Sequence, residues 1–552
     1  MNLTTLDVTV IVIYAIFIFG LAQYVSREKG GKAKDSSDYF LASKNLPWWA
    51  IGASLIAANI SAEQIVGMSG SGYAIGLAIA SYEWMAALTL LIVGKYFLPI
   101  FLKNHIYTMP QFLEQRYGTT IRTIMAVFWL ALYVFVNLTS IVWLGSIAVT
   151  TVAGVDQDVA LWALGGFALL YQVYGGLKAV ALTDIVQVTL LVLGGLLISF
   201  ITLSEIGGEA GFIGGFSRLT TELPGHFDMI LSPDNPFYKD LPGLSVLIGG
   251  MWIANLSYWG FNQYIIQRAL AAKSLAEAQK GVVFAAFLKL LMPVIVVLPG
   301  IAAVVLAPGL AKPDQAYPTM MGLLPAGILG LVFAALMAAV VASTASKINS
   351  IATIFTLDLY AKYRGIGSVA EEGVAGEGNA PGAASVGAPQ APPTGGLAAN
   401  ERHLVLVGRI TAAVATLLAL LTARPLLGNS DQAFQFIQEF SGFFTPGITV
   451  IFLLGLFWKK ASEAGAIGAA VASVVLSYLF KVLLPELPFM DRMGIVFLAS
   501  LALAVVLSIV FPASAGRDRI TTDGISYATT KGFNVAALLV VLILVALYAT
   551  WW

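Results

Sequence analysis

The sequence predicts an all-α protein that crosses a membrane many times. Of its 552 residues, 58% are hydrophobic and only 11% are charged, whereas soluble proteins carry about 25% charged residues. Apolar stretches long enough to span a bilayer as helices, about 20 residues each, recur along the whole chain. Two of these stretches contain polar residues at membrane depth, a pattern typical of inverted-repeat transporters.

Hydropathy predicts about fourteen transmembrane helices. The first, at 6–25, has no basic residue before it and no small-residue cleavage site, so we expect a retained helix rather than a signal peptide. The others are expected at 46–70, 76–103, 120–152, 158–175, 180–203, 244–270, 278–308, 325–361, 403–425, 432–457, 461–485, 492–512 and 533–551.

These spans divide the chain into regions. Each interrupted span opens a run of five helices. A polar, acidic segment separates the two runs, and a segment rich in Gly, Ala and Pro lacks the apolar side chains needed to fold. We expect a leading helix and cytoplasmic loop at 1–45, five-helix repeats at 46–203 and 244–457, an extracellular loop at 204–243, a disordered cytoplasmic linker at 365–400, and three trailing helices at 458–552.

The distribution of basic residues among the loops predicts which side of the membrane each helix end faces. With the N-terminus outside, most of the 30 basic residues fall in loops that face the cytoplasm. The even helix count then places the C-terminus outside as well. Because the 30 acidic residues cancel the 30 basic ones, we expect no nucleic-acid partner.

Composition also argues against an enzyme. There is no cysteine, which excludes disulfides, iron–sulfur clusters, thiolate zinc sites and cysteine nucleophiles. The three histidines, His105, His226 and His403, lie in polar connecting segments. The spans contain no metal-ligand spacing and no nucleophile–base pair, so we expect neither a catalytic site nor a cofactor.

The two interruptions predict a cavity at the bilayer midplane. A helix that faces lipid should not unwind, because its free backbone groups would lack partners. One break is expected at Ala58-Asn59-Ile60-Ser61, before Glu63 and Gln64, and the other at Asn255, Ser257 and Gly260. The alternative is that small residues at these points only allow helices to pack closely.

Further polar residues lie within the apolar spans. Polar and ionisable side chains there usually face a cavity or a partner; those concerned are Glu83, Asp184, Lys289, Gln438 and Glu439. Amides that donate and accept, with one acid and one lysine, suit sugar hydroxyls. Aromatic residues that could pack on a sugar ring or act as gates are Tyr82, Tyr258, Trp259 and Phe434. An amino acid substrate, or a carboxylate–lysine pair that only locks helices together, remains an alternative.

The ninth span carries hydroxyl side chains at helical spacing, Ser343, Thr344 and Ser346. Together with carbonyls of an unwound segment they would form an all-oxygen site suited to sodium. Ordinary back-bonding of these hydroxyls to the helix is the alternative.

Three long stretches carry a resemblance to a known family: GASLIAANISAEQIVGMSGSGYAIGLAIASYEW, NPFYKDLPGLSVLIGGMWIANLSYWGFNQYIIQRALAAKSLAEAQKG, and the QAFQFIQEF to GLFWKK block. The chain resembles the sodium/solute symporters, most closely their bacterial sodium/galactose branch, over nearly its whole length. The resemblance implies a LeuT-type fold, location in a bacterial inner membrane and symport of a monosaccharide with sodium by alternating access.

The resemblance also implies roles for particular residues. Sugar contacts would come from Gln64, Glu83, Asn255, Lys289 and Gln438, with Asn59 nearby. Met68, Tyr82 and Phe434 would form the outer gate and Tyr258 the inner one. Sodium would bind the carbonyls of Ala57, Ile60 and Ala339 and the hydroxyl of Ser343, and Asp184 would lie near the ion exit path or a second ion site.

Two positions depart from the family pattern. Ala342 stands where a second hydroxyl ligand is usual, which predicts weaker sodium binding or looser coupling. Ala86 stands where the sugar-transporting relative has a serine contact, which leaves open a different solute such as an amino acid, sialic acid, inositol or an organic anion. A sensor that binds without transporting, and a channel, are further alternatives that uptake measurements separate.

Overall fold

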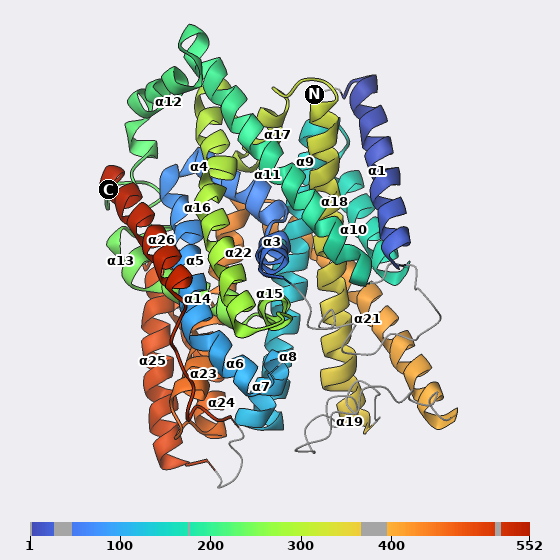
Figure 1. The fold of residues 1–552 in the computed structure, drawn as a ribbon, viewed down its shortest axis with the longest axis vertical. Helices are drawn as coiled ribbons and strands as arrows, with labels where there is room; N and C mark the ends of the chain where they lie inside the picture. The colour runs from blue at the N-terminus through green and yellow to red at the C-terminus, as the bar shows by residue number, and fades with distance from the viewer. Residues whose placement is uncertain (1–2, 27–46, 107, 175–176, 366–394, 514–519) are drawn as a thin grey trace.

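The computed structural model is almost entirely helical, with long helices running roughly parallel (Figure 1). It describes the chain except residues 1–2, 27–46, 107, 175–176, 366–394 and 514–519. Both described ends lie toward the same side of the bundle (Figure 1).

The first five-helix run follows the leading helix α1 (Thr5–Ser26). Several of its spans are interrupted by π-helical or 3₁₀ turns. In order, its elements are α3 (Trp48–Asn59), η2 (Glu63–Gly67) with α4 (Met68–Ala74), η3 (Leu77–Ala80), α5 (Ser81–Ile92), η4 (Val93–Phe97) with α6 (Leu98–Lys103), α7 (Met109–Arg116), α8 (Thr119–Ala131), η5 (Leu132–Leu138), α9 (Thr139–Ala153), α10 (Gln157–Tyr174) and α11 (Leu177–Gly207).

The second run begins after two short helices, α12 (Gly211–Glu222) and α13 (Leu244–Ile248). Its elements are α14 (Gly250–Phe261), α15 (Gln263–Leu270), α16 (Leu275–Leu306), η8 (Pro313–Gln315), α17 (Ala316–Met321), α18 (Ile328–Thr353), η9 (Ile354–Ala361), α19 (Lys362–Arg364), α21 (Gly395–Leu427), α22 (Ala433–Ser441) and α23 (Thr445–Phe457). Three further helices follow: α24 (Glu463–Leu483), α25 (Phe489–Val510) and α26 (Lys531–Thr550).

Helices therefore occupy every range in which the sequence predicts a span. Among the described residues, nine helices are long and apolar enough to cross a membrane, or eleven when two bent pairs each count as one span. The multi-pass all-α class is confirmed, whereas the number fourteen stays a prediction.

Helix α16 forms the centre of the bundle, where it packs against α3, α4, α5 and α11. Glycines permit this close approach. A Cβ at Gly52 of α3 would lie 2.7 Å from the carbonyl oxygen of Gly281, and a Cβ at Gly300 would lie 2.1 Å from that of Ser69. Small residues at helix contacts supply the packing that lipid cannot drive.

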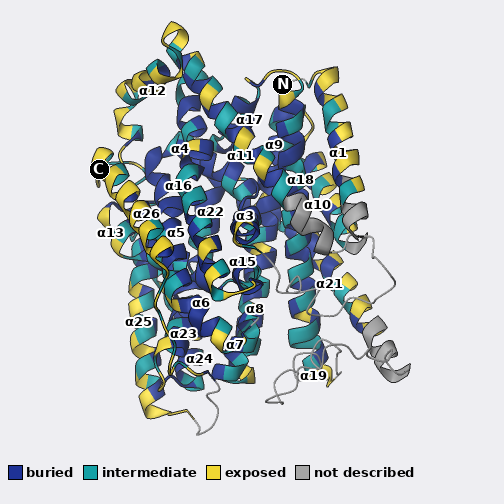
Figure 2. Ribbon diagram, in the orientation of Figure 1, coloured by how far each residue is buried: buried dark blue, intermediate teal, exposed yellow. Residues whose placement is uncertain are grey.

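The outer helices carry apolar side chains on their surface, while the central ones are buried (Figure 2). On α24, α25 and α26 the exposed residues include Leu483, Leu498, Ile509 and Val545. Exposed apolar surface of this extent is incompatible with water and fits contact with lipid tails.

Two boundaries differ from expectation. The segment 204–243 contains the end of α11 and the helix α12, which packs back on α11. The predicted 365–400 linker lies largely outside the described residues, and α21 already begins at Gly395.

Candidate substrate and cation site

The first predicted break lies where the sequence places it. Helix α3 ends at Asn59, Ile60 is extended (φ −69°, ψ 114°), and the chain resumes as a π-helical turn at Glu63. The two helical halves bend by 68°. The break does not face lipid, because Asn59, Ile60 and Ser61 are all buried within the protein.

The second break is real, but its predicted position at Asn255, Ser257 and Gly260 is wrong. All three residues lie inside the continuous helix α14, and the extended residue is Asn262 (φ −82°, ψ 119°). The Asn255 amide donates to the Met251 carbonyl one turn earlier at 3.1 Å, which keeps it inside the helix. Asn262 instead accepts from the Tyr133 hydroxyl at 2.9 Å, so its partner lies on another element.

The corrected position makes the two halves more alike. Both α3 and α14 are 12-residue helices, and each ends at a single extended residue before a short helix. This correspondence supports two repeats that each open with a broken helix.

Four of the predicted substrate residues converge beside the first break. The Lys289 ammonium of α16 lies 2.5 Å from the Glu83 carboxylate of α5 and also donates to the Asn59 side-chain carbonyl. The Gln64 amide donates to Glu83 at 3.0 Å. Lys289 is fully buried, so its charge depends on these partners.

Asn255 and Gln438 lie on helices that pack against elements of this cluster. Asn255 is buried on α14, which packs against the α5 helix of Glu83. Gln438 is half-buried on α22, which packs against η2 and α4. The cluster therefore draws its polar groups from α3, η2, α5 and α16, with α14 and α22 beside it.

The residues predicted to form an outer gate are buried. The rings of Tyr82 and Phe434 meet edge to face with centroids 5.1 Å apart, and both are buried. Met68 is also fully buried.

Tyr258, the predicted inner gate, bonds to residues of two other elements. Its hydroxyl lies 3.0 Å from the Asn59 amide, which donates to it, and 2.6 Å from the Tyr264 hydroxyl. Trp259 stacks edge-on against Tyr258 and lies under the Lys289 ammonium, 5.0 Å from the ring centre.

A small cavity lies between the first break and α18. Its volume is about 30 Å³, enough for about two water-sized groups. Two of the predicted sodium ligands, Ala57 and Ser343, line it, and so does Ala342, which offers no hydroxyl. The carbonyl-bearing residues Ile60 and Ala339 are buried nearby on the same two elements. Asp184, predicted near an ion exit path, has a side chain outside the described part of the structure.

Sequence reasoning missed the other charges of this cavity. Lys347 is buried, with its ammonium 3.5 Å from the ring centre of Tyr264 and 4.8 Å from that of Tyr133. Glu63, across the cavity on η2, accepts from the Ser140 hydroxyl. The sequence feature that could have revealed this charge is the lysine among the small residues of the ninth span.

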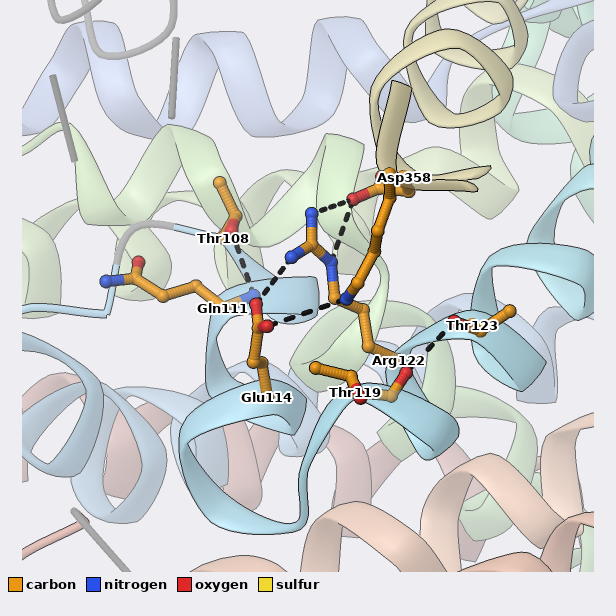
Figure 3. Close-up of polar contacts among 8 residues, drawn as sticks. Thr108, Gln111, Glu114, Thr119, Arg122, Thr123 and Asp358 are labelled. Atoms are coloured by element: carbon orange, nitrogen blue, oxygen red, sulfur yellow. Dashed lines mark hydrogen bonds and ion pairs between the residues drawn. The ribbon is translucent and has the colours of Figure 1, made fainter. Parts of the chain in front are cut away.

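A second unforeseen network ties α7, α8 and η9 together (Figure 3). The Arg122 guanidinium donates to Asp358 at 3.0 Å through Nε and also pairs with Glu114. Lys362 reaches the other Glu114 oxygen at 3.6 Å. The group lies near the end of the bundle that carries α19, opposite the N-terminus (Figure 1).

Asp314 joins two elements at the other end of the bundle, in the turn that follows α16. It is 1% exposed, and its Oδ2 accepts from the backbone N–H of Ala433 at 3.1 Å. Burial raises the pKa of Asp314 to about 7, with the nearby Asp431 adding to the shift and the Ala433 N–H and Lys312 opposing it. The carboxyl therefore sits at the first residue of α22, next to Phe434, a predicted gate residue.

This architecture defines a class of protein: a multi-pass helical transporter in which broken helices border a polar cluster and a cation-sized cavity. The model of the sodium:solute symporter family matches residues 39–378 and 396–472. The chain belongs to the sodium:solute symporter family, whose members are transporters and not enzymes.

Curated relatives match most or all of the chain. It is 48% identical to a sodium/glucose cotransporter of Vibrio parahaemolyticus, over 100% of this chain and 99% of that protein. It is 32% identical to sodium/myo-inositol cotransporter 2 of Bos taurus, over 85% of this chain and 69% of that protein.

Solved structures confirm the fold class. A substrate-bound, outward-open Na⁺-coupled sialic acid symporter superposes with a TM-score of 0.72 at 21% identity, over 93% of this chain and 99% of that one. A closed transporter of the nucleobase-cation-symport-1 family superposes with a TM-score of 0.52 at 12% identity, over 88% of this chain and 98% of that one. The predicted LeuT-type arrangement is thereby confirmed.

Proposed function

We propose that the protein is a symporter that uses sodium entry to take up a monosaccharide, galactose-like or glucose-like, by alternating access. The family supplies the class of activity, and the full-length relative named a sodium/glucose cotransporter supports the choice of solute. The observation that carries the proposal is the buried cluster of Lys289, Glu83, Gln64 and Asn59 beside the first helix break.

The chemistry of this cluster suits sugar hydroxyls. In the closed state its members bond to one another, so none is left buried and unsatisfied. Hydroxyl groups both donate and accept, so a sugar can replace these bonds one for one as it enters. A solute without hydroxyls would leave buried polar groups without partners, at a cost of about 1–3 kcal/mol for each.

The cavity between the first break and α18 supports the ion step. Sodium bound by carbonyls of Ala57, Ile60 and Ala339 and by the Ser343 hydroxyl would hold α18 against the break. In our proposal this contact favours the outward-open state, sugar closes Tyr82 against Phe434, and rocking of the two repeats then separates α18 from α3 and frees the ion inward.

We also propose that the protein lies in the bacterial inner membrane with both termini outside. The basic residues Lys362 and Arg364 of α19 lie at the end of the bundle away from the described N-terminus, which supports this orientation (Figure 1).

Uptake of labelled galactose into proteoliposomes tests the proposal. We expect rapid uptake with an inward sodium gradient and little with choline in place of sodium. Gln64→Ala should abolish uptake, while Gln187→Ala, a buried glutamine of α11 outside the cluster, should not. Equal uptake in sodium and choline, or normal uptake by Gln64→Ala, would contradict it.

A second candidate solute is a cyclic polyol. Several relatives about 31% identical are named sodium/myo-inositol cotransporters, and Ala86 leaves the cluster without one expected hydroxyl. Competition of galactose uptake by glucose, myo-inositol, sialic acid and amino acids decides among these solutes, since the true substrate should compete at the lowest concentration.

A further inference from the structure

The cation cavity holds more positive charge than a sodium site needs. Two basic side chains, Lys347 and Arg268, line it together with one acid, Glu63. The Arg268 guanidinium is held by the Ser54 hydroxyl and, at 3.4 Å, by the Tyr264 carbonyl. Lys347 is buried, and its ammonium lies against the Tyr264 ring.

Lys347 also stands close to the predicted sodium ligands. It follows Ser343 by four residues on α18, so the two side chains lie one above the other on one face, with Cβ atoms about 6 Å apart. Both line the same cavity of about 30 Å³. A sodium ion at Ser343 would therefore share that cavity with the Lys347 ammonium.

The repulsion between two such cations is large. If the two charges are about 6 Å apart and the effective dielectric constant is about 20, the repulsion lowers the affinity of the second cation by roughly a factor of one hundred. Glu63 opposes this effect but is a single charge, and it also accepts from Ser140. The missing hydroxyl at Ala342 removes a ligand from the same site.

We propose that Lys347 is a built-in cation of this cavity that sets the ion dependence of the transporter. Its ammonium, which lies against the Tyr264 ring in the cavity that Glu63 also lines, occupies part of the space and the negative potential that sodium would use. Sodium binding is therefore weak, and transport requires a high sodium concentration. This inference rests on the sodium-coupled function proposed above.

A purely structural role makes a different prediction. If Lys347 only ties α18 to η2 through Glu63, its replacement destabilises the protein but leaves sodium binding unchanged in the folded molecules. Sodium affinity, measured separately from stability, distinguishes the two roles.

The experiment compares Lys347→Met, which keeps length and removes charge, with wild type and with Lys95→Met, which removes a half-buried lysine from η4. Two readouts are titrated with sodium at constant ionic strength in choline: galactose uptake into proteoliposomes, and the rise in thermal unfolding temperature in detergent without sugar. Lys347→Gln serves as a second variant if Lys347→Met does not fold.

We expect the half-saturating sodium concentration of Lys347→Met to fall at least tenfold in both readouts, and that of Lys95→Met to stay within twofold of wild type. A folded Lys347 variant with wild-type sodium dependence would overturn the inference, as would failure of both variants to fold. If no sugar is taken up but the thermal titration still shifts tenfold, the inference stands and the proposed function fails.

Discussion

The buried carboxyl of Asp314 leads us to predict that opening of the proposed outer gate depends on pH. Its carboxyl lies between α4, where a Cβ at Gly70 would meet it at 2.4 Å, and the first residue of α22. A movement of α22 that takes Phe434 away from Tyr82 also moves Ala433, its immediate neighbour and the Asp314 partner. Opening should therefore expose the carboxyl to water.

The size of the effect follows from the two pKa values. Burial raises the pKa of Asp314 from 3.8 to about 7 in the closed state. At about 1.4 kcal/mol for each pH unit, the full difference is about 4 kcal/mol. The closed state gains this stability below pH 3.8 and loses it as the pH rises toward 7. Between pH 5 and pH 7 these pKa values shift the equilibrium roughly fiftyfold toward the open state, because half of the closed-state carboxyls are already ionised at pH 7.

The absence of cysteine from the sequence permits a direct assay. A Gln435→Cys variant places one thiol on the buried outer part of α22, to be modified from outside by a membrane-impermeant reagent. Thiol chemistry itself accelerates with pH, so rates are divided by those of Ser217→Cys, a thiol on the exposed face of α12.

In the Gln435→Cys variant that keeps Asp314, the normalised rate of thiol modification should rise steeply between pH 5 and pH 7. It should stay flat after Asp314→Asn, which keeps the shape of the side chain and cannot ionise. The same rise in both backgrounds would refute the role of this carboxyl.

Three further predictions concern the substrate cluster, the Arg122 network and the predicted ion site. Lys289→Met should abolish uptake and lower the free energy of unfolding by about 3–5 kcal/mol, because it leaves the Glu83 carboxylate buried and unpaired. Adding Glu83→Gln should restore thermal stability but not uptake. Recovery of uptake in the double variant would count against the site. Arg122→Ala should destabilise the inward-closed conformation by removing the contact with Asp358. Efflux of preloaded sugar should then accelerate, while the equilibrium affinity for sugar changes little. Unchanged efflux would mean that the network has only a structural role. Ala342→Ser should lower the half-saturating sodium concentration by restoring a hydroxyl to the cavity, and an unchanged value would contradict our placement of the ion.

Local sequence was sufficient to predict the spans and the first break. Asn59, Ser61 and Gln64 place several polar groups at membrane depth within six residues, and few structures other than a cavity can satisfy them. The buried position of Lys289 followed from the same reasoning, since a lone lysine amid apolar residues requires a partner.

The second break was misplaced because polar side chains inside a helix have two ways to be satisfied. Asn255 bonds within its own helix, whereas Asn262 bonds to Tyr133, which is 129 residues away. Local sequence does not distinguish these outcomes. The Arg122–Asp358 contact could not be predicted either, because its two residues are 236 positions apart in the sequence.

Accumulation of sugar against its gradient tests the central claim most directly. One charge crossing 100 mV supplies about 2.3 kcal/mol, and a tenfold sodium gradient supplies about 1.4 kcal/mol. With one sodium for each sugar, the total could hold roughly a 500-fold sugar gradient. Proteoliposomes with both driving forces should therefore concentrate labelled galactose well above the outside level and release it when a sodium ionophore is added. Uptake that never exceeds the outside concentration, or accumulation that the ionophore leaves unchanged, would contradict sodium-coupled symport.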